Sequence, residues 1–525
     1  TSRFQGINIF RVCFSVSQCY ICFMFVRKKK NKSGVISIQI IDKSRGKYKL
    51  LKTIGSSSDT EEIDLLYKKG KEFINNYQGQ QTLIFPDSNF SRTVADSIKS
   101  IDIEGVNLLL GKLYSEIGFD KIGSELLKQL VIIRLSHPAS KLKTTQYLKR
   151  YFSIEVNEDK IYRYLDKIYC EQKETIQQIS YDHTVEILGG IANVVFYDVT
   201  TLYFQIDDED EIRKRGFSKE GKHQNPQIIL GLLVSLGGYP LAYEIHEGNK
   251  YEGHTMLPIV DTFKSKYKVE KLIIIADSGL LTKDNVSDLE SKGYEFILGA
   301  RIKNETTEMK DKILALNLSN GKSNIIKKND VLRMIISYSD KRAKKDKYNR
   351  ERGLQKLEKK VKSGKLTKSN INNRGYNKYL HMEGDVSISI DMKKFEQDAK
   401  WDGLKGYITN TSLTNDEIIE NYNHLWEIEK AFRVSKHDLK IRPIYHRLQR
   451  RIEAHITINF TAYKIYKELE RQLKVKQSEL SPEQAIEIAK TIYSINVTNP
   501  IDKTLEKQVL LINEEQKYLA NLFDF

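Results

Sequence analysis

Polar and apolar positions near the start of the chain alternate with the period of a β-strand. Within residues 34–54 the isoleucines at every second position would share one face of a strand, and they are Ile36, Ile38 and Ile40. The polar run at 42–46 has the composition of a turn, and the alternation resumes at Tyr48. The pattern predicts a small basic β-hairpin module, with its linker, over residues 24–94.

Between residues 95 and 190 the apolar period becomes that of a helix. Aliphatic side chains recur at helical spacing from Leu126 to Ile133. Two short helices are predicted at 144–152 and 159–169, and the second carries lysine and arginine beside tyrosines. The pair is consistent with a helix-turn-helix that reads DNA, and equally with any small helical domain. We expect a mostly helical region here, with DNA binding as one interpretation.

Residues 191–300 change to short apolar runs separated by helical segments. The order is strand, hairpin, helix, strand, helix, strand, at 193–197, 228–245, 255–267, 271–276, 283–292 and 296–298. This order predicts a mixed sheet with helices, as in an α/β nuclease core.

The rest of the chain would interrupt this core and then complete it. Residues 301–405 hold a lysine-rich stretch and short strand-like pieces at 331–338 and 385–391, so we expect an insertion subdomain there. Residues 406–475 would complete the core with one long helix from about 415 and another at 450–475. We expect residues 476–525 to form a helical tail.

Composition narrows the class of protein. The 525 residues suggest about three to four domains, and 85 Lys and Arg against 69 Asp and Glu give a net charge of +16. This charge suits a polyanionic partner, although codon bias in an AT-rich genome would also enrich lysine. With no apolar run of about 20 residues, no membrane span is expected. Residues 1–23 lack an initiator Met, and we interpret them as upstream or disordered sequence before a natural start at Met24.

Two aspartates stand where buried strands are predicted to end. Asp198 follows the strand 193–197, and Asp277 follows the strand 271–276. Side chains just past the ends of neighbouring strands converge on one edge of a sheet. A strand-end acid that caps the next element is the alternative for either residue taken alone.

A third acid, Glu429, lies on the helix predicted to begin near 415. A capping box at 414–417 opens this helix, and Glu429 falls on the apolar stripe expected to face the core. A buried carboxylate requires an ion pair or a metal. Lys436 is two turns away, about 10 Å, so it would pair with Glu429 only loosely. We favour a metal-facing role over a structural ion pair.

Three carboxylates of this kind suit two divalent ions, which would activate a nucleophile and stabilise the leaving oxygen in phosphoryl transfer. Basic residues near Glu429 suit backbone phosphates, and they include Arg433, Arg442 and His446. The segment 216–223 approaches a P-loop, but His223 replaces the required Ser or Thr and no buried strand precedes it, so no nucleotide cofactor is expected.

The segment Tyr422-x2-Leu425-x3-Glu429-x6-Lys436 resembles the Tyr-Arg-Glu-Lys signature of DDE transposases from bacterial insertion sequences. The likeness is to the IS-four-like branch and its IS-sixteen-thirty-four-like group, with Leu425 at the arginine position. The segments 197–204 and 276–281 are similar to the first and second acid motifs of the group. The resemblance extends over roughly residues 25–495.

The resemblance implies an RNase H-like mixed-sheet catalytic core with a β-rich insertion, preceded by a mostly helical DNA-binding region. It implies Asp198, Asp277 and Glu429 as metal-binding catalytic acids for Mg²⁺ or Mn²⁺. Tyr422 and Lys436 would contact DNA near the cleaved end. The implied protein is a homodimeric transposase of the bacterial cytoplasm and nucleoid, which cuts terminal inverted repeats and transfers a 3′-hydroxyl to target DNA.

Two other functions remain open from the sequence alone. One is an inactive or domesticated DNA-binding protein that acts as a repressor. The other is a metal-dependent nuclease with no joining activity.

Overall fold

The computed structural model describes residues 24–43, 47–77, 97–190, 192–218, 221–280, 282–364, 366, 371–372, 375–383, 387–498 and 504–525. The segment 1–23, interpreted above as upstream or disordered, lies outside the described residues. The chain forms two compact units, Thr1–Ser97 and Ile98–Phe525, and each is described by itself.

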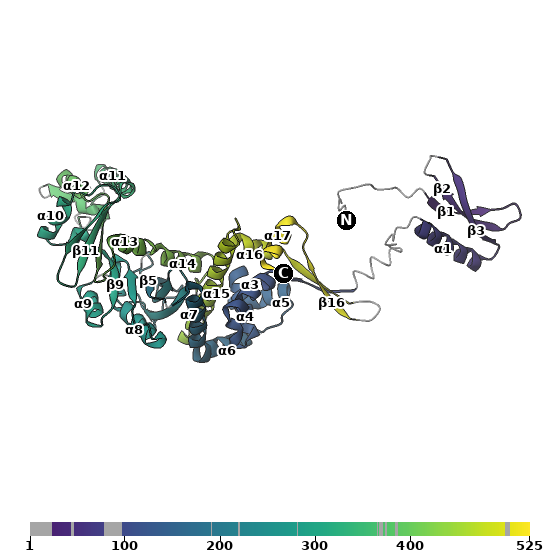
Figure 1. The fold of residues 1–525 in the computed structure, drawn as a ribbon, viewed down its shortest axis with the longest axis horizontal. Coiled ribbons are helices and arrows are strands. Elements are labelled where there is room, and N and C mark those ends of the chain that lie inside the picture. Colours follow the sequence, from purple (N-terminus) through teal and green to yellow (C-terminus); the bar gives the residue numbers. More distant parts are fainter. Residues whose placement is uncertain are drawn as a thin grey trace. The chain divides into compact units, whose positions relative to one another are not determined.

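The first unit is a three-stranded antiparallel sheet with one helix packed on it (Figure 1). Its elements are β1 (Met24–Lys30), β2 (Ile36–Asp42), β3 (Lys49–Ser57) and α1 (Thr60–Tyr77). The predicted hairpin is β2 and β3, and Ile38 and Ile40 of β2 are fully buried. The sequence did not reveal the third strand, β1, which pairs with β2 and carries a basic run of four residues, 27–30.

The second unit is built on an eight-stranded sheet in the order β10-β11-β14-β9-β8-β5-β6-β7. The strands are β5 (Val194–Tyr203), β6 (Gln227–Ser235), β7 (Pro240–Glu247), β8 (Ile273–Ala276), β9 (Glu295–Ala300), β10 (Ser323–Lys327), β11 (Arg333–Tyr338) and β14 (Leu404–Thr409). β5, β6 and β7 form an antiparallel meander, and β8 and β9 run parallel to β5. This arrangement of five strands is RNase H-like, in agreement with the predicted fold class.

Helices cover both faces of this sheet (Figure 1). One face packs under α8 (Met256–Tyr267), α9 (Lys283–Ser291) and α10 (Thr307–Ala315). The other packs under α13 (Asn415–Asn423) and α14 (Trp426–His437). Side chains of β5 alternate between these two cores, with Tyr197 in the first and Phe196 in the second.

The predicted insertion, 301–405, is joined to the sheet. Its strands β10 and β11 extend the sheet through β14. The lysine-rich stretch forms α11 (Asp340–Lys362), and a smaller lobe holds β12 (Leu380–Glu383), β13 (Ser387–Ile390) and α12 (Met392–Ala399). The expected strand pieces at 331–338 and 385–391 correspond to β11 and β13.

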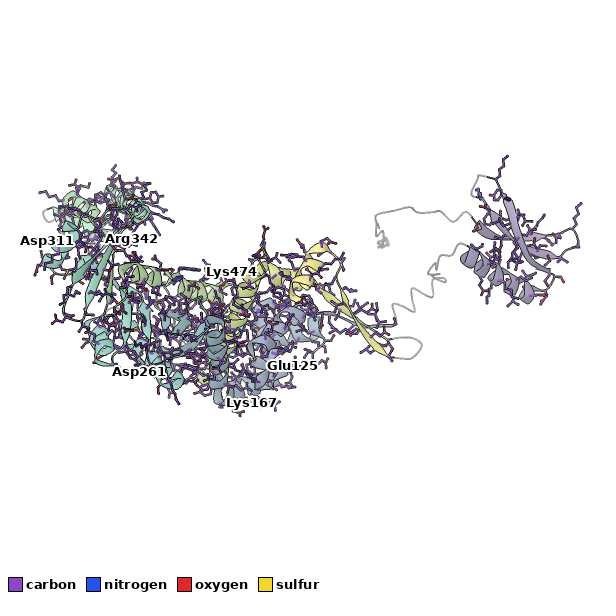
Figure 2. The ribbon with its side chains drawn as sticks, viewed as in Figure 1. Glu125, Lys167, Asp261, Asp311, Arg342 and Lys474 are labelled. Atoms are coloured by element: carbon purple, nitrogen blue, oxygen red, sulfur yellow. The ribbon has the colours of Figure 1, made fainter. Side chains whose placement is uncertain are left out.

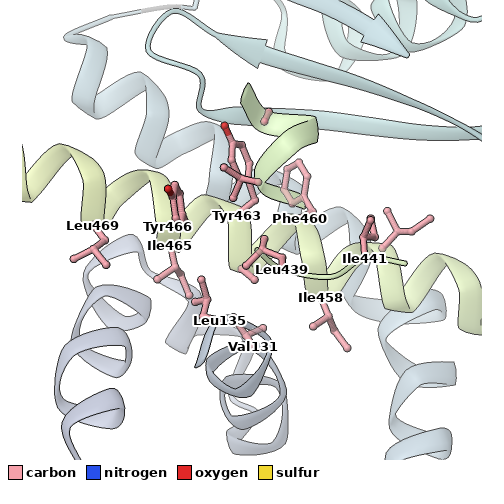
Figure 3. Close-up of a cluster of buried hydrophobic side chains, with 14 of the residues drawn as sticks. Val131, Leu135, Leu439, Ile441, Ile458, Phe460, Tyr463, Ile465, Tyr466 and Leu469 are labelled. Atoms are coloured by element: carbon pink, nitrogen blue, oxygen red, sulfur yellow. The ribbon is translucent and has the colours of Figure 1, made fainter. Parts of the chain in front are cut away.

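The helical region consists of α3 (Gly105–Ile117), α4 (Glu125–Ser136), α5 (Lys141–Phe152), α6 (Glu158–Lys167) and α7 (Lys173–Leu188). These helices pack around α15 (Gln449–Val475), a 27-residue helix that is buried over most of its length. Figure 3 shows Val131 and Leu135 of α4 facing Ile458 and Ile465 of α15. The long helix therefore joins the helical region to the eight-stranded sheet.

The prediction of a helical tail over 476–525 is wrong in part. The segment contains α16 (Pro482–Ala489) and α17 (Glu514–Phe523), but between them lies a hairpin of β15 (Tyr493–Thr498) and β16 (Leu505–Leu510). β15 also pairs with β4 (Ile98–Ile103), and Asn496 Nδ2 donates to Ser100 Oγ across 396 positions of sequence. The local pattern of apolar residues does not indicate a strand that pairs with a partner so distant in the sequence. Among the described residues, no helix is both long and apolar enough to cross a bilayer.

Candidate active site

Asp198 lies in the middle of a strand, and its predicted place at a strand end is wrong. β5 continues to Tyr203 because residues 199–202 pair with the buried strand β6. Asp198 pairs with Leu232, and the strand alternation places it on the same face as Phe196 and Leu202. That face is the one covered by α14.

Asp277 directly follows β8, as predicted. Ala276 of β8 pairs with Tyr197 of β5 in the parallel register. The residue after each of them is an aspartate, Asp277 after Ala276 and Asp198 after Tyr197. Neighbouring strands lie about 4.8 Å apart, and residues in register share a face. Asp198 and Asp277 therefore occupy adjacent positions on the face that α13 and α14 cover.

Tyr422 of α13 contacts one acid of this pair, Asp277. Its side chain is 5% exposed, and its hydroxyl donates to Asp277 Oδ1 at 3.1 Å. Burial raises the pKa of Tyr422, and the charge of Asp277 raises it further. Gly299 of β9 makes room for this contact, because a Cβ at that position would overlap the Tyr422 hydroxyl.

Glu429 is exposed on α14, so the prediction that it faces the core is wrong. The neighbouring acid, Glu427, is buried instead, with 8% exposure, and its Oε2 lies 4.0 Å from Lys467 Nζ.

The cause is a break in the helix that the sequence predicts as continuous from 415. The amide of Leu425 bonds to Tyr422 O, and the amide of Glu427 bonds to His424 O. In a helix with i→i+3 bonds, each residue is rotated about the helix axis by about 120° from the one before, whereas in an α-helix this rotation is about 100°. The apolar stripe therefore shifts phase after Tyr422, and Glu429 turns away from the core. The predicted capping box at Thr414 and Glu417 is present.

Lys405 of β14 interacts electrostatically with both Asp277 and the helix acid Glu429. Burial lowers its pKa, the charge of Arg342 on α11 lowers it further, and the charges of Asp277 and Glu429 act in the opposite direction. Its ammonium lies 4.3 Å from the centroid of the Tyr422 ring. Figure 2 labels Arg342 in the lobe formed by the predicted insertion.

Sequence reasoning missed Lys405. The available signal was weak. Lys405 lies two positions before the buried Tyr407, so the two side chains share one face of β14.

A family model described as the transposase DDE domain matches residues 189–465. This range is more than half of the chain and includes Asp198, Asp277 and Glu429. The chain belongs to the DDE transposase family.

Solved structures give remote likenesses to this DDE transposase. The piggyBac transposase in a synaptic complex with hairpin DNA is 8% identical, with 75% of this chain and 80% of that chain covered and a TM-score of 0.35. The Mos1 mariner paired-end complex with Mn is 9% identical, with 44% and 72% covered and a TM-score of 0.14. Because these TM-scores are low, the assignment of the chain to its family rests on the family model alone. No curated protein matches the chain.

The donor chemistry of the three acids suits divalent ions. Carboxylate oxygens are the ligands that Mg²⁺ and Mn²⁺ prefer. Within the part of the chain that the structure describes, no three His, Cys, Asp or Glu side chains form a group ready to hold a metal. Asp198 and Asp277 are adjacent by register, while Glu429 shares with Asp277 the electrostatic neighbours Tyr422 and Lys405.

The other basic residues of this DDE transposase differ in surroundings. Arg433 is exposed on α14, and Lys436 is half-buried near its end. The Arg442 guanidinium lies 5.0 Å from the Tyr203 ring centroid, and His446 is buried, with 8% exposure. Arg450 and Arg451 both pair with Asp166 of α6, and Lys430 pairs with Glu470, so these three charges hold helices together.

Proposed function

We propose that this protein is the transposase of a bacterial insertion sequence. It binds the terminal inverted repeats of its element, cleaves the DNA ends and joins the 3′-hydroxyls to target DNA. The observation that carries the proposal is the register of β5 and β8. It sets Asp198 beside Asp277, on the face covered by the two helices that hold Tyr422 and Glu429.

Asp198, Asp277 and Glu429 are the proposed ligands of two Mg²⁺ or Mn²⁺ ions. Such ions lower the pKa of a bound water or 3′-hydroxyl and stabilise the leaving oxygen in phosphoryl transfer. Tyr422 orients the Asp277 carboxylate through its hydrogen bond. Lys405 offsets the charge repulsion between Asp277 and Glu429 before the ions bind.

Backbone phosphates are the proposed ligands of Arg433, Lys436, Arg442 and His446. Tyr422 and Lys436 would lie nearest the cleaved end. The net charge of +16 supports a polyanionic partner. Affinity for the ends is expected to fall steeply between about 50 and 200 mM salt, as it does for interfaces dominated by phosphate contacts.

The Tyr422, Glu429 and Lys436 spacing supports membership of the IS-four-like branch and its IS-sixteen-thirty-four-like group. Leu425, at the arginine position of that signature, is buried at the helix break with 7% exposure, so one phosphate contact is replaced by core packing. We further propose that the protein acts as a homodimer on paired ends, in the bacterial cytoplasm on the nucleoid.

The proposed organisation assigns DNA binding to the helical region at 95–190, which follows the small basic module and its linker at 24–94. The catalytic core is formed by 191–300 and 406–475, interrupted by the insertion at 301–405. The segment 476–525 follows the core.

The test is a cleavage and strand-transfer assay on a duplex that carries the inverted repeat flanking the gene, with Mg²⁺. Wild type is compared with Asp198→Asn, Asp277→Asn and Glu429→Gln. Glu420→Gln removes an exposed carboxylate from α13 and serves as the matched control. We expect joined products from wild type and the control alone, with end binding retained by all the variants.

Strand transfer that persists in any of the three acid variants would refute the assignment of these residues. Free ends without joined products would identify a nuclease. Binding that is independent of divalent ions, with no cutting, would identify a decayed or regulatory DNA-binding protein.

A further inference from the structure

A second basic site lies away from the three acids, in a pocket of ≈ 370 Å³ between α4, the start of α5 and the segment that joins α14 to α15. Its basic lining residues come from three separate parts of the chain. They are Arg134, Lys141, Lys440, Arg442, His446 and His455. The sequence analysis singled out Arg442 and His446 and gave no reason to place them with Arg134 or Lys141.

Two basic side chains of this pocket, Arg134 and Lys141, are buried without an acidic partner among the described residues. Arg134 is 4% exposed and Lys141 is 5% exposed. The Arg134 guanidinium donates only long hydrogen bonds, at 3.5 and 3.4 Å, to the carbonyls of Leu439 and Lys440. Among the described residues, the Lys141 ammonium has neither a hydrogen-bond acceptor nor a carboxylate within reach. Burying an unpaired charge costs several kcal/mol, so this arrangement favours a bound anion.

The electrostatic surroundings of both cations agree with their burial. Burial lowers the pKa of Arg134 to about 10, and it lowers the pKa of Lys141 well below its ordinary value, with Arg134 adding to the effect. Burial and the charges of Lys141 and Arg134 also hold His455 neutral by lowering its pKa. Each group therefore lacks the negative charge that would restore its ordinary pKa.

The pocket also receives the start of a helix. α5 has 12 residues and begins at Lys141, with Ser140 as its N-cap accepting from the Lys143 amide at 3.3 Å. Free amides and the helix dipole at such an end favour negative charge, and phosphate groups above all. One carboxylate, Glu158, lines the pocket, and it already accepts from the Tyr162 hydroxyl at 2.8 Å.

We propose that this pocket seats a backbone phosphate of the bound DNA, with Lys141 and Arg134 as its buried cations. The proposal rests on the proposed function and adds a phosphate subsite to it. Lys440 and Tyr445 are exposed at the pocket rim and suit the neighbouring phosphate and sugar of an extended strand better than an isolated small anion.

The test uses the full chain and the end duplex. Lys141→Met keeps the length of the side chain and removes the buried charge, while Lys143→Met makes the same change of net charge at an exposed position of α5. We expect Lys141→Met to raise the melting temperature of the free protein and to weaken end binding. The slope of log affinity against log salt should fall by about 1, and Lys143→Met should leave the end affinity close to wild type.

A scan with single neutral methylphosphonates along the duplex locates the contact. One position should weaken wild-type binding and have no effect on Lys141→Met. If no position behaves in this way and the salt slopes are equal, the pocket does not hold DNA phosphate. Cleavage by wild type in the same experiment would keep that failure separate from a failure of the proposed function.

Inorganic phosphate alone distinguishes the other source of the same chemistry. Thermal stabilisation by millimolar phosphate that Lys141→Met abolishes, without any change in end binding, would assign the pocket to a free anion and overturn the proposal. If Lys141→Met fails to fold, Arg134→Met at the other buried cation supports the same comparison, with the same outcome required.

Discussion

The hydroxyl of Tyr422 donates to Asp277 Oδ1 at 3.1 Å, across 145 positions of sequence. A hydrogen bond to a charged group is worth about 1.5–3 kcal/mol, and here it also fixes the orientation of the carboxylate. We expect Tyr422→Phe to slow single-turnover cleavage by about tenfold or more, with unchanged affinity for the ends.

Tyr407→Phe is the matched control for this prediction. Tyr407 is equally buried and packs against Tyr422, but its hydroxyl meets only Ser337, at 3.5 Å, among the described residues. A wild-type cleavage rate in Tyr422→Phe, or an equal loss in both variants, would contradict a specific role for the bond to Asp277.

Gly299 permits that hydrogen bond, so a methyl group there should disturb it. A Cβ at Gly299 would overlap the Tyr422 hydroxyl and lie 3.0 Å from the amide of Ser278. We expect Gly299→Ala to cost about 1–3 kcal/mol of unfolding free energy, as overpacking does in other cores. Denaturant titration measures the loss. The double variant Gly299→Ala with Tyr422→Phe should regain part of it, and strict additivity of the two changes would argue against the clash.

Lys405 places a positive charge where the divalent ions are proposed to bind. Because it interacts with both Asp277 and Glu429, it competes electrostatically with a metal cation. We expect Lys405→Met to lower the Mg²⁺ concentration needed for half-maximal thermal stabilisation, and to destabilise the protein without metal. Lys400→Met, at the end of α12, provides the control. A higher Mg²⁺ requirement in Lys405→Met would show that Lys405 instead supports the ions.

Lys464 should make stability depend on pH. Its side chain is fully buried in α15, with Nζ 2.5 Å from Thr184 Oγ1, and burial lowers its pKa from 10.5 to about 7. Between these two values the unfolded chain holds a proton that the folded chain has released. The contribution of Lys464 to stability therefore rises with pH from about 7 to 10.5 and is constant below 7.

Urea unfolding of wild type and Lys464→Met at pH 7.5 and 9 measures this effect. The free-energy difference between the two proteins should change by up to about 1.4 kcal/mol per pH unit, in favour of wild type at the higher pH. Lys474→Met changes an exposed residue of the same helix, and its unfolding free energy should change with pH as that of wild type does. If the unfolding free energy of Lys464→Met also changes with pH as that of wild type does, Lys464 stays charged in the folded protein.

Local sequence was sufficient for elements whose signal lies within a few residues. The apolar run that ends at Asp277 predicts both β8 and the acid after it, and Thr414 with Glu417 predicts the capping box. Asp198 was misplaced because its charge was interpreted as the end of the apolar run 193–197, although the β-branched Thr200 and Thr201 after it suit a strand. Pairing with β6 makes them strand.

The rest of the candidate site depends on contacts that no local pattern records. Glu429 is exposed because two i→i+3 hydrogen bonds, from the amides of Leu425 and Glu427, change the phase of the helix, and no proline or glycine marks that place. Lys405 meets Asp277 and Glu429 only because β14 joins the sheet next to β9.

The pairing of β4 with β15 has a consequence for synthesis of the protein. β4 stands at the start of the second unit and its neighbour β15 close to the end of the chain. At a synthesis rate of about 5–20 residues per second, β4 emerges from the ribosome roughly 20–80 s before its partner exists. Throughout that interval its edge is open to pairing with other chains. This sheet is therefore complete only after β15 has been synthesised, and nascent chains are the form of the protein most vulnerable to aggregation.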